Sequence, residues 1–312
     1  MNYSIIIPHR NIPHLLQRLL SSIPQRNDME VIIVDDNSNP ECVDFEYFPG
    51  IERNDTKVIF DKKGGGGGYA RNIGLSHATG ERVVFADADD FFNYCFNDVL
   101  DDCLNVESDI VYCKAASLDS DFYTPTFRTN HLNRYVDSFL KGDKAGETNL
   151  RYMFGEPWCK IIKKSLIVEN QIKFDETSIH NDTTFSYLCG FHAKSVAVDK
   201  RAIYNVTSRE GSVSVQISET KKKERIMVFS RSYVFFRKHG LDVVEERHFK
   251  QLYECKRENV STYKEGLEIM ISSGIPLRVI RIRMLKQYLC HLYPLVLLGR
   301  LKRHLKYKIR EL

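Results

Sequence analysis

Three carboxylates are concentrated in one short turn of the chain, at Asp87, Asp89 and Asp90. They follow the apolar segment 82–85, which predicts a buried strand ending where open α/β sheets place their ligands. Carboxylates this close repel one another, and a divalent cation would relieve the repulsion while keeping positions for substrate phosphates. A solvated acidic turn that caps the following segment is the alternative that spacing alone leaves open.

Segments with strand and helix patterns alternate around this turn. Strand patterns occupy residues 3–7, 30–34, 57–60, 82–85 and 109–113, and helix patterns occupy 15–23, 69–78 and 97–105. This alternation predicts an α/β fold with a largely parallel sheet and helices on both faces. Residues 117–150 are polar and weakly periodic, which predicts a loop-rich insertion.

The second half of the chain changes character. A strand–helix unit is predicted at 160–168, followed by a helix that begins at Asn181 or Asp182. Two strands are predicted after that helix, at 195–198 and 202–206. After about residue 218 the pattern is helical, and it becomes strongly basic from residue 276. We therefore predict one α/β domain over 1–216 and a helical region over 217–312.

Composition is that of an ordinary soluble protein, with 43% hydrophobic and 28% charged residues among 312. The start of the chain has no signal-peptide pattern, and the apolar stretch 288–298 is too short to span a bilayer. Eight cysteines without a CxxC pair argue against a zinc site or a disulfide framework and suit a reducing cytoplasm. These features predict a cytoplasmic location.

Charge is distributed unevenly. Residues 276–312 carry ten Lys or Arg against one Glu, a net charge of +9. Because the whole chain has a net charge of +4, residues 1–275 have a net charge of −5. Basic and apolar residues alternate in this tail, which predicts a peripheral contact with an anionic membrane surface, whereas a solvated helical face is the alternative. The net negative charge of residues 1–275 does not indicate a nucleic-acid partner.

Two further motifs permit more than one interpretation. The glycine run 64–68 loosely fits a dinucleotide fingerprint, but the first strand leads into residues 8–11 without a glycine, so we favour a flexible loop that approaches a nucleotide. Asp35 and Asp36 end a strand and suit either a base or ribose contact or an Asx turn. By themselves, His180 predicts a surface or packing histidine and Asp182 a helix N-cap.

Taken together, the motifs resemble the family 2 glycosyltransferases, inverting enzymes of the GT-A fold. The resemblance covers roughly residues 3–214 and keeps the family's order. The matching segments are Ser4–Pro8 with Arg10 and Asn11, Val34–Ser38, Ala70–Leu75, Ala78–Glu81, Phe85–Asp90, Glu156–Lys160, Asn181–Phe185 and Arg209–Ser214.

The resemblance implies that residues 1–216 are the catalytic domain, with a nucleotide-sugar half at about 1–115 and an acceptor half at about 116–216. It also implies a role for each matching position. Asp36 would contact the nucleotide base, most often uracil, and Asp182 would be the catalytic base. Asp89 would bind Mg²⁺ or Mn²⁺ at the diphosphate, and Asp87 would lie near the ribose, the donor sugar or the metal. The other implied nucleotide or donor contacts are Pro8, Arg10, Gly67, Gly68, Arg71, Arg209 and Ser212. Acceptor contacts are implied for Trp158 and Lys160, with a core role for Trp158 and a solvent-facing Lys160 as alternatives.

The resemblance implies a metal-dependent transfer, with inversion, of a sugar from a nucleotide-sugar to a glycan or lipid-linked glycan. The implied donor is a UDP-sugar. Such enzymes build surface polysaccharides. One position departs from the family, because Asn181 stands where a Glu is usual. A catalytically silent nucleotide-sugar-binding subunit is therefore the second hypothesis, and a Rossmann oxidoreductase is the third.

Overall fold

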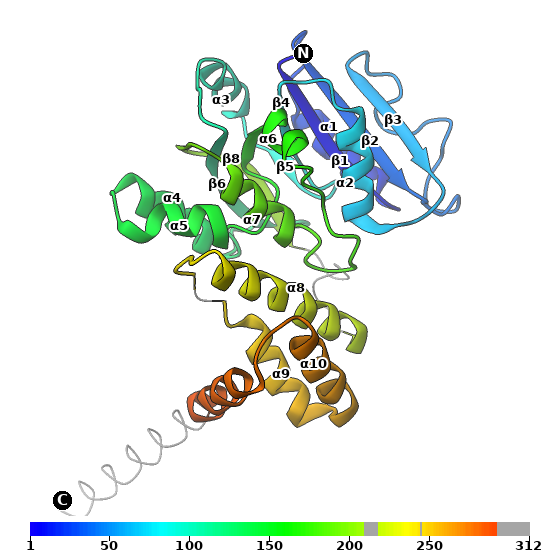
Figure 1. The fold of residues 1–312 in the computed structure, drawn as a ribbon. Coiled ribbons are helices and arrows are strands. Elements are labelled where there is room, and N and C mark those ends of the chain that lie inside the picture. Colours follow the sequence, from blue (N-terminus) through cyan, green and yellow to red (C-terminus); the bar gives the residue numbers. More distant parts are fainter. Residues whose placement is uncertain (209–217, 244, 292–312) are drawn as a thin grey trace, which may run out of the picture. The chain divides into compact units, whose positions relative to one another are not determined.

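The computed structural model describes residues 1–208, 218–243 and 245–291, and these divide into two units, one within 1–216 and the other within 217–312 (Figure 1). The predicted contacts Arg209 and Ser212, and most of the basic tail, lie outside the described residues. The first unit contains the sheet and the second is helical.

The first unit is built on a mixed eight-stranded sheet in the order β3-β2-β1-β4-β7-β6-β8-β5. The strands are β1 (Tyr3–His9), β2 (Met29–Asp36), β3 (Thr56–Asp61), β4 (Arg82–Phe85), β5 (Phe91–Phe92), β6 (Ile110–Asp119), β7 (Lys160–Lys163) and β8 (Val196–Ser208). Strands β1 to β4 pair in parallel as predicted, whereas β7 runs antiparallel to β4 and β6, and β5 antiparallel to β8. The two strands predicted at 195–198 and 202–206 form one strand, β8, whose pairing with β6 is irregular beside Cys113.

Strands β1, β2 and β4 form the centre of the parallel part, and their side chains explain why. All residues of β2 are buried except Glu30, and all four residues of β4 are buried, which matches apolar strands covered on both faces. Ile6 lies opposite Ile32 on one side and Phe85 on the other. Because these strands are parallel, their carboxyl ends meet at one edge of the sheet, where the polar residues that follow them are placed together.

Seven helices of the first unit lie among the described residues. They are α1 (Pro13–Ser22), α2 (Gly66–His77), α3 (Phe96–Cys103), α4 (Asn130–Leu140), α5 (Lys144–Met153), α6 (Lys164–Glu169) and α7 (Thr183–His192). The prediction of a loop-rich insertion at 117–150 is wrong, because β6 extends to Asp119 and α4 and α5 fill most of the remainder. The apolar periodicity of this segment is weak because α4 buries only Leu132 and Val136.

The glycine run begins helix α2 and does not form the flexible loop that we predicted. Gly66, with φ of +88°, is the first residue of the helix. A Cβ at Gly68 would lie 1.9 Å from the carbonyl oxygen of Asp175, so the glycine lets that segment pack directly on the helix. The side chain of Asn72 fixes the same segment, since it exchanges hydrogen bonds of 2.9 and 3.0 Å with the backbone of Phe174.

The second unit contains α8 (Glu219–Lys238), α9 (Arg247–Glu258) and α10 (Val260–Ser272), and residues 277–291 are also helical. Its apolar cluster includes Ile226, Phe249, Leu252, Met270 and Ile280. None of the helices in the described part of the chain has both the length and the apolar character needed to cross a membrane.

Replacing Gly68 by Ala should destabilise the fold by about 1–3 kcal/mol, because the new methyl group would displace the Asp175 carbonyl from α2. The measurement is urea unfolding followed by circular dichroism. The matched control is Gly155→Ala, since a Cβ there would meet only Thr183 Oγ1 at 3.8 Å. Equal stability of the two variants would contradict the packing role of Gly68.

Candidate functional site

The carboxyl ends of β1 and β2 bring two predicted acidic residues into different environments. Asp35 is buried and accepts hydrogen bonds from His9 Nδ1 at 2.8 Å and from the Ser38 hydroxyl at 2.5 Å. Burial by itself would raise the pKa of Asp35, but the hydrogen bonds from His9 and Ser38 outweigh it and lower that pKa. Asp35 is therefore occupied in holding the ends of the two strands together.

Asp36 has capacity for a ligand. Its Oδ2 atom accepts a hydrogen bond from the backbone N–H of Gly66 at 2.8 Å and lies 3.9 Å from Arg10 Nη1. Its Oδ1 atom is buried, and no atom of the described residues hydrogen-bonds to it. Because an unsatisfied buried acceptor is costly, this atom suits a ligand that donates hydrogen bonds, as a nucleotide base does.

Arg71 connects the acidic turn to the start of α7. Its guanidinium group is buried and forms an ion pair with Asp87 through Nη2, while Nη1 donates to Asn181 Oδ1 at 2.9 Å. It also lies 5.5 Å from the centre of the Phe174 ring. Asn181 is thus a neutral hydrogen-bond partner of Arg71, and Asp87 is its carboxylate partner. A Cβ at Gly67 would lie 3.4 Å from Arg71 Nη1.

The backbone of the acidic turn is held by three side chains from two other elements, α1 and β8. The carbonyl oxygen of Asp89 accepts hydrogen bonds from Arg18 Nη2 at 2.5 Å and from Thr207 Oγ1 at 2.7 Å. The backbone N–H of Asp87 donates to the Tyr204 hydroxyl at 2.8 Å. These contacts fix the backbone from which the carboxylates project.

Asp90 supports the turn from inside the protein. Its Oδ1 atom accepts a hydrogen bond from the backbone N–H of Thr207 at 2.7 Å, and its side chain is buried. Burial raises its pKa well above the ordinary value, and the negative charges of Asp89 and Asp87 raise it further. Asp87 and Asp89 are therefore close enough for their charges to affect Asp90.

The acidic turn suits a magnesium-type site more than an all-protein metal cage. No cluster of three or more His, Cys, Asp or Glu residues suited to hold a metal ion occurs in the described part of the chain. Mg²⁺, however, is usually held by one or two carboxylates together with water and substrate phosphates. The pair Asp87 and Asp89 offers that donor set, and the repulsion felt at Asp90 is what a dication would reduce.

Asp182 occupies the N-cap position of α7, as the interpretation from the residues alone predicted, but its side chain makes no capping hydrogen bond. Burial raises its pKa to about 6, with further contributions from the charges of Glu156 and Asp87, while Arg71 acts in the opposite direction. The Oε2 atom of Glu156 is buried and has no hydrogen-bond partner among the described residues. With a pKa of about 6, the carboxylate of Asp182 is mainly charged at neutral pH and can accept a proton.

Trp158 and Lys160 do not have the positions expected of acceptor contacts. Trp158 is only 5% exposed and stacks on Tyr204, so the alternative of a core role describes it. Lys160 is 1% exposed, and its ammonium group donates to the Phe154 carbonyl at 2.6 Å and to the Ser186 hydroxyl at 3.0 Å. Both expectations for Lys160 are corrected, because it neither faces solvent nor presents its charge to a ligand at the surface.

Several residues with clear roles in the site were not assigned such roles from the sequence. Arg18, Tyr204 and Thr207 reach the acidic turn from positions 71 to 118 residues away along the chain. No local pattern around them predicts this contact. Glu156 did lie within a motif of the resemblance, and its acidic character could have suggested an influence on the catalytic base.

Titration of Asp182 should give a midpoint near pH 6, since burial and the neighbouring charge of Glu156 both favour the protonated carboxyl. The measurement is the pH dependence of its carboxyl ¹³C chemical shift, assigned with the variant Asp182→Asn. Glu156→Gln should lower the midpoint without restoring the ordinary value, because burial remains. A wild-type midpoint close to 4 would contradict this description of the environment.

Comparison with known proteins places the chain among glycosyltransferases. A poly(ribitol-phosphate) beta-N-acetylglucosaminyltransferase, TarS of Staphylococcus aureus, is 26% identical over 224 residues, which is 68% of this chain and 36% of TarS. The chain thus spans about a third of that relative. The crystal structure of TarS 1–349 in complex with UDP-GlcNAc is similar in fold, with a TM-score of 0.65, 21% identity and coverage of 92% of this chain and 89% of that one.

A more distant structure, a mannosyltransferase from Pyrobaculum calidifontis in complex with GDP-Man and Mn²⁺, has a TM-score of 0.53 at 16% identity, covering 94% of this chain and 81% of that chain. The predicted α/β fold of GT-A type is confirmed by these likenesses. The family model described as glycosyl transferase family 2 matches residues 4–168, just over half of the chain. The chain therefore belongs to glycosyl transferase family 2, as its motifs indicated.

Proposed function

We propose that this protein is an inverting, metal-dependent glycosyltransferase that moves a sugar from a nucleotide-sugar to a hydroxyl group of a glycan. The observation that carries the proposal is the meeting of Asp36, Asp87, Arg71 and Asp182 at the carboxyl-end edge of one sheet, in a member of family 2. These residues supply a base contact, a metal ligand, a cation and a proton acceptor.

The donor is proposed to be a UDP-sugar whose base hydrogen-bonds to Asp36. Support comes from the buried, unpartnered Oδ1 atom of Asp36 and from the similar fold of TarS, which was crystallised with UDP-GlcNAc. Arg10 lies beside the same carboxylate, and Pro8 precedes it at the end of β1, so we retain both as donor contacts. The roles of Gly67, Gly68, Arg209 and Ser212 toward the nucleotide also remain proposals.

Asp89, with Asp87, is proposed to hold Mg²⁺ or Mn²⁺. When bound, the ion would neutralise charge that builds on the leaving diphosphate, without a proton transfer. Arg71 contributes a fixed positive charge next to Asp87, and its Nε atom is buried without a hydrogen-bond partner among the described residues. The turn is already anchored through Arg18 and Thr207, so the carboxylates need little rearrangement.

Asp182 is proposed as the catalytic base. Its pKa near 6 leaves it mainly deprotonated at pH 7 and still able to take a proton from the attacking hydroxyl. Attack from the side opposite the leaving diphosphate inverts the configuration at the anomeric carbon. We assign Lys160 a positioning role, because it links the Phe154 carbonyl to Ser186 on the helix that Asp182 begins.

The acceptor is proposed to be a growing surface glycan, in some cases attached to a lipid. The relative TarS is a poly(ribitol-phosphate) beta-N-acetylglucosaminyltransferase, an enzyme that acts on a polymer. The basic residues from 276 onward are proposed to contact an anionic membrane. Among those in the described part of the chain, Arg278 and Arg281 are exposed, whereas Arg283 and Lys286 pair with Glu246.

The wild-type enzyme should release nucleoside diphosphate from one member of a panel of UDP- and GDP-sugars, only with Mg²⁺ or Mn²⁺, in an extract containing lipid-linked glycans. Asp89→Ala and Asp182→Asn should each lower kcat by about 10²–10⁴-fold, through loss of a metal ligand and of general-base assistance. Asp98→Asn is the matched control, because Asp98 is an exposed carboxylate in the first turn of α3.

Two results would count against the proposed enzyme. Turnover that Asp182→Asn leaves unchanged would remove Asp182 from catalysis. Metal-dependent donor binding without turnover in the same extract would favour the silent subunit, for which Asn181 is the specific observation.

Deleting residues 292–312 should weaken co-sedimentation with phosphatidylglycerol vesicles, because this segment carries six Lys or Arg against one Glu. The deletion stops at 292 because Ile280 is buried in the apolar cluster of the helical unit, and a larger truncation would remove it. Phosphatidylcholine vesicles are the neutral control. Equal co-sedimentation of the full and shortened chains would refute membrane contact through this segment.

A further inference from the structure

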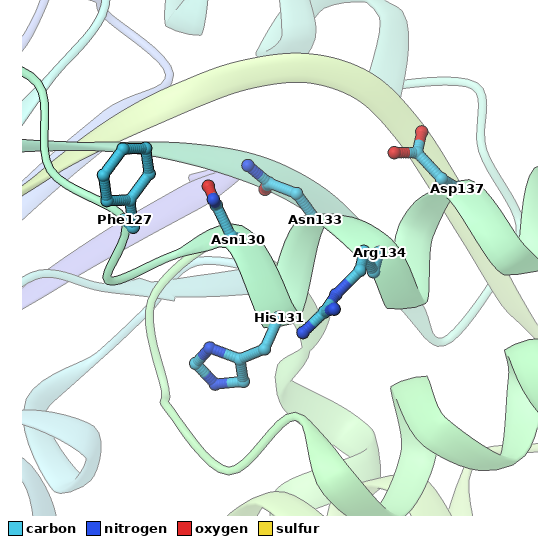
Figure 2. A pocket seen from close by; sticks show the side chains of 6 residues that line it. All are labelled: Phe127, Asn130, His131, Asn133, Arg134 and Asp137. Carbon is cyan, nitrogen blue, oxygen red and sulfur yellow. The ribbon is translucent and has the colours of Figure 1, made fainter. Parts of the chain in front are cut away.

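An open pocket lies along α4, apart from the acidic turn. Its volume of about 500 Å³ is within the usual range of ligand sites. Figure 2 shows Phe127 at one end and Asp137 at the other, with His131 and Arg134 between them. The lining residues are Phe127, Asn130, His131, Asn133, Arg134 and Asp137.

The pocket presents a positive charge. Arg134 is exposed, and no carboxylate within residues 1–208, 218–243 and 245–291 forms an ion pair with it. Asp137, the acidic residue of the lining, is neutralised by Lys114, whose ammonium group lies 2.5 Å from Asp137 Oδ1. The guanidinium group of Arg134 can therefore bind a phosphate or carboxylate through two parallel hydrogen bonds.

The pocket also offers a flat apolar surface and a fixed frame. Phe127 is 84% exposed, so its ring face is accessible to the C–H face of a sugar. The amide of Asn133 is used within the protein, since it exchanges hydrogen bonds of 2.8 and 3.0 Å with the backbone of Ala115 on β6. This pairing anchors α4 to the sheet, while the exposed amide of Asn130 can contact sugar hydroxyls.

His131 connects the pocket with the neighbourhood of the proposed base. Its Nε2 atom lies 3.9 Å from Glu156 Oε1. Glu156 is the charged residue that contributes most to raising the pKa of Asp182. The pocket and Asp182 thus approach the same carboxylate, so a chain of sugars passing the base can extend over α4.

We propose that this pocket is an acceptor subsite for an anionic glycan unit, one that carries a phosphate or a carboxylate. Arg134 binds the anionic group and Phe127 stacks on the sugar ring of the unit next to the one being glycosylated. This inference rests on the proposed glycosyltransferase function, and it names the chemical class of the acceptor.

The test measures binding of glucose 6-phosphate, glucuronate and glucose by saturation-transfer NMR, with UDP and Mn²⁺ added to occupy the proposed donor site. Wild-type protein should bind at least one of the two anionic sugars more tightly than glucose, and the anion that binds identifies the group as phosphate or carboxylate. Arg134→Gln should weaken that binding about tenfold, since a charged hydrogen bond is lost. Phe127→Ala should weaken binding of glucose and the anionic sugars alike.

The matched control is Lys141→Gln, which removes one exposed positive charge at the end of α4, outside the pocket lining. If Lys141→Gln and Arg134→Gln weaken binding equally, or if wild-type protein does not prefer an anionic sugar, the subsite is refuted. In separate samples without added UDP or a sugar acceptor, wild-type protein is tested for slow, metal-dependent release of nucleoside diphosphate from the nucleotide-sugar to water. Release there, together with no preference for an anionic sugar in the binding assay, overturns the subsite alone, so its failure is distinguishable from failure of the donor chemistry.

Discussion

The buried guanidinium group of Arg71 holds the candidate site together. It joins three segments that are distant in sequence, because it sits on α2, pairs with Asp87 in the acidic turn and donates to Asn181 before α7. A buried cation is stable only when its partners are near and well oriented, so the three segments are constrained to one arrangement. The same contact places the proposed catalytic base, Asp182, beside the proposed phosphate-binding residues.

The acidic turn illustrates how the protein stabilises groups that repel one another. Asp87 is compensated by Arg71, and the backbone around Asp89 is fixed by Arg18 and Thr207. Asp90 is buried, and its pKa is raised by that burial and by the charges of Asp89 and Asp87. A turn built in this way would hold the proposed dication and diphosphate without first having to be ordered by them.

The charges around Arg71 also explain what changes when position 181 is Asn and not Glu. A Glu at this position would give Arg71 a second carboxylate partner, whereas the amide accepts a hydrogen bond and adds no charge. More of the positive charge of Arg71 is then available to a diphosphate, and one fewer negative charge lies next to Asp182. The substitution therefore alters the electrostatics of the site and preserves the connection between α2 and the start of α7.

Much of the fold followed from the sequence by itself. The β-branched segments fixed the central strands, and the acidic residues after them had to meet at one edge because the strands are parallel. Local pattern failed where few residues are buried, as in α4, and where glycines serve close packing, as at Gly68. Only tertiary structure decided that Lys160 is buried, that Tyr204 reaches Asp87 across 117 residues, and that Arg71 meets Asn181 across 110. Such contacts depend on how distant segments pack, and the spacing of residues along the chain does not contain that information.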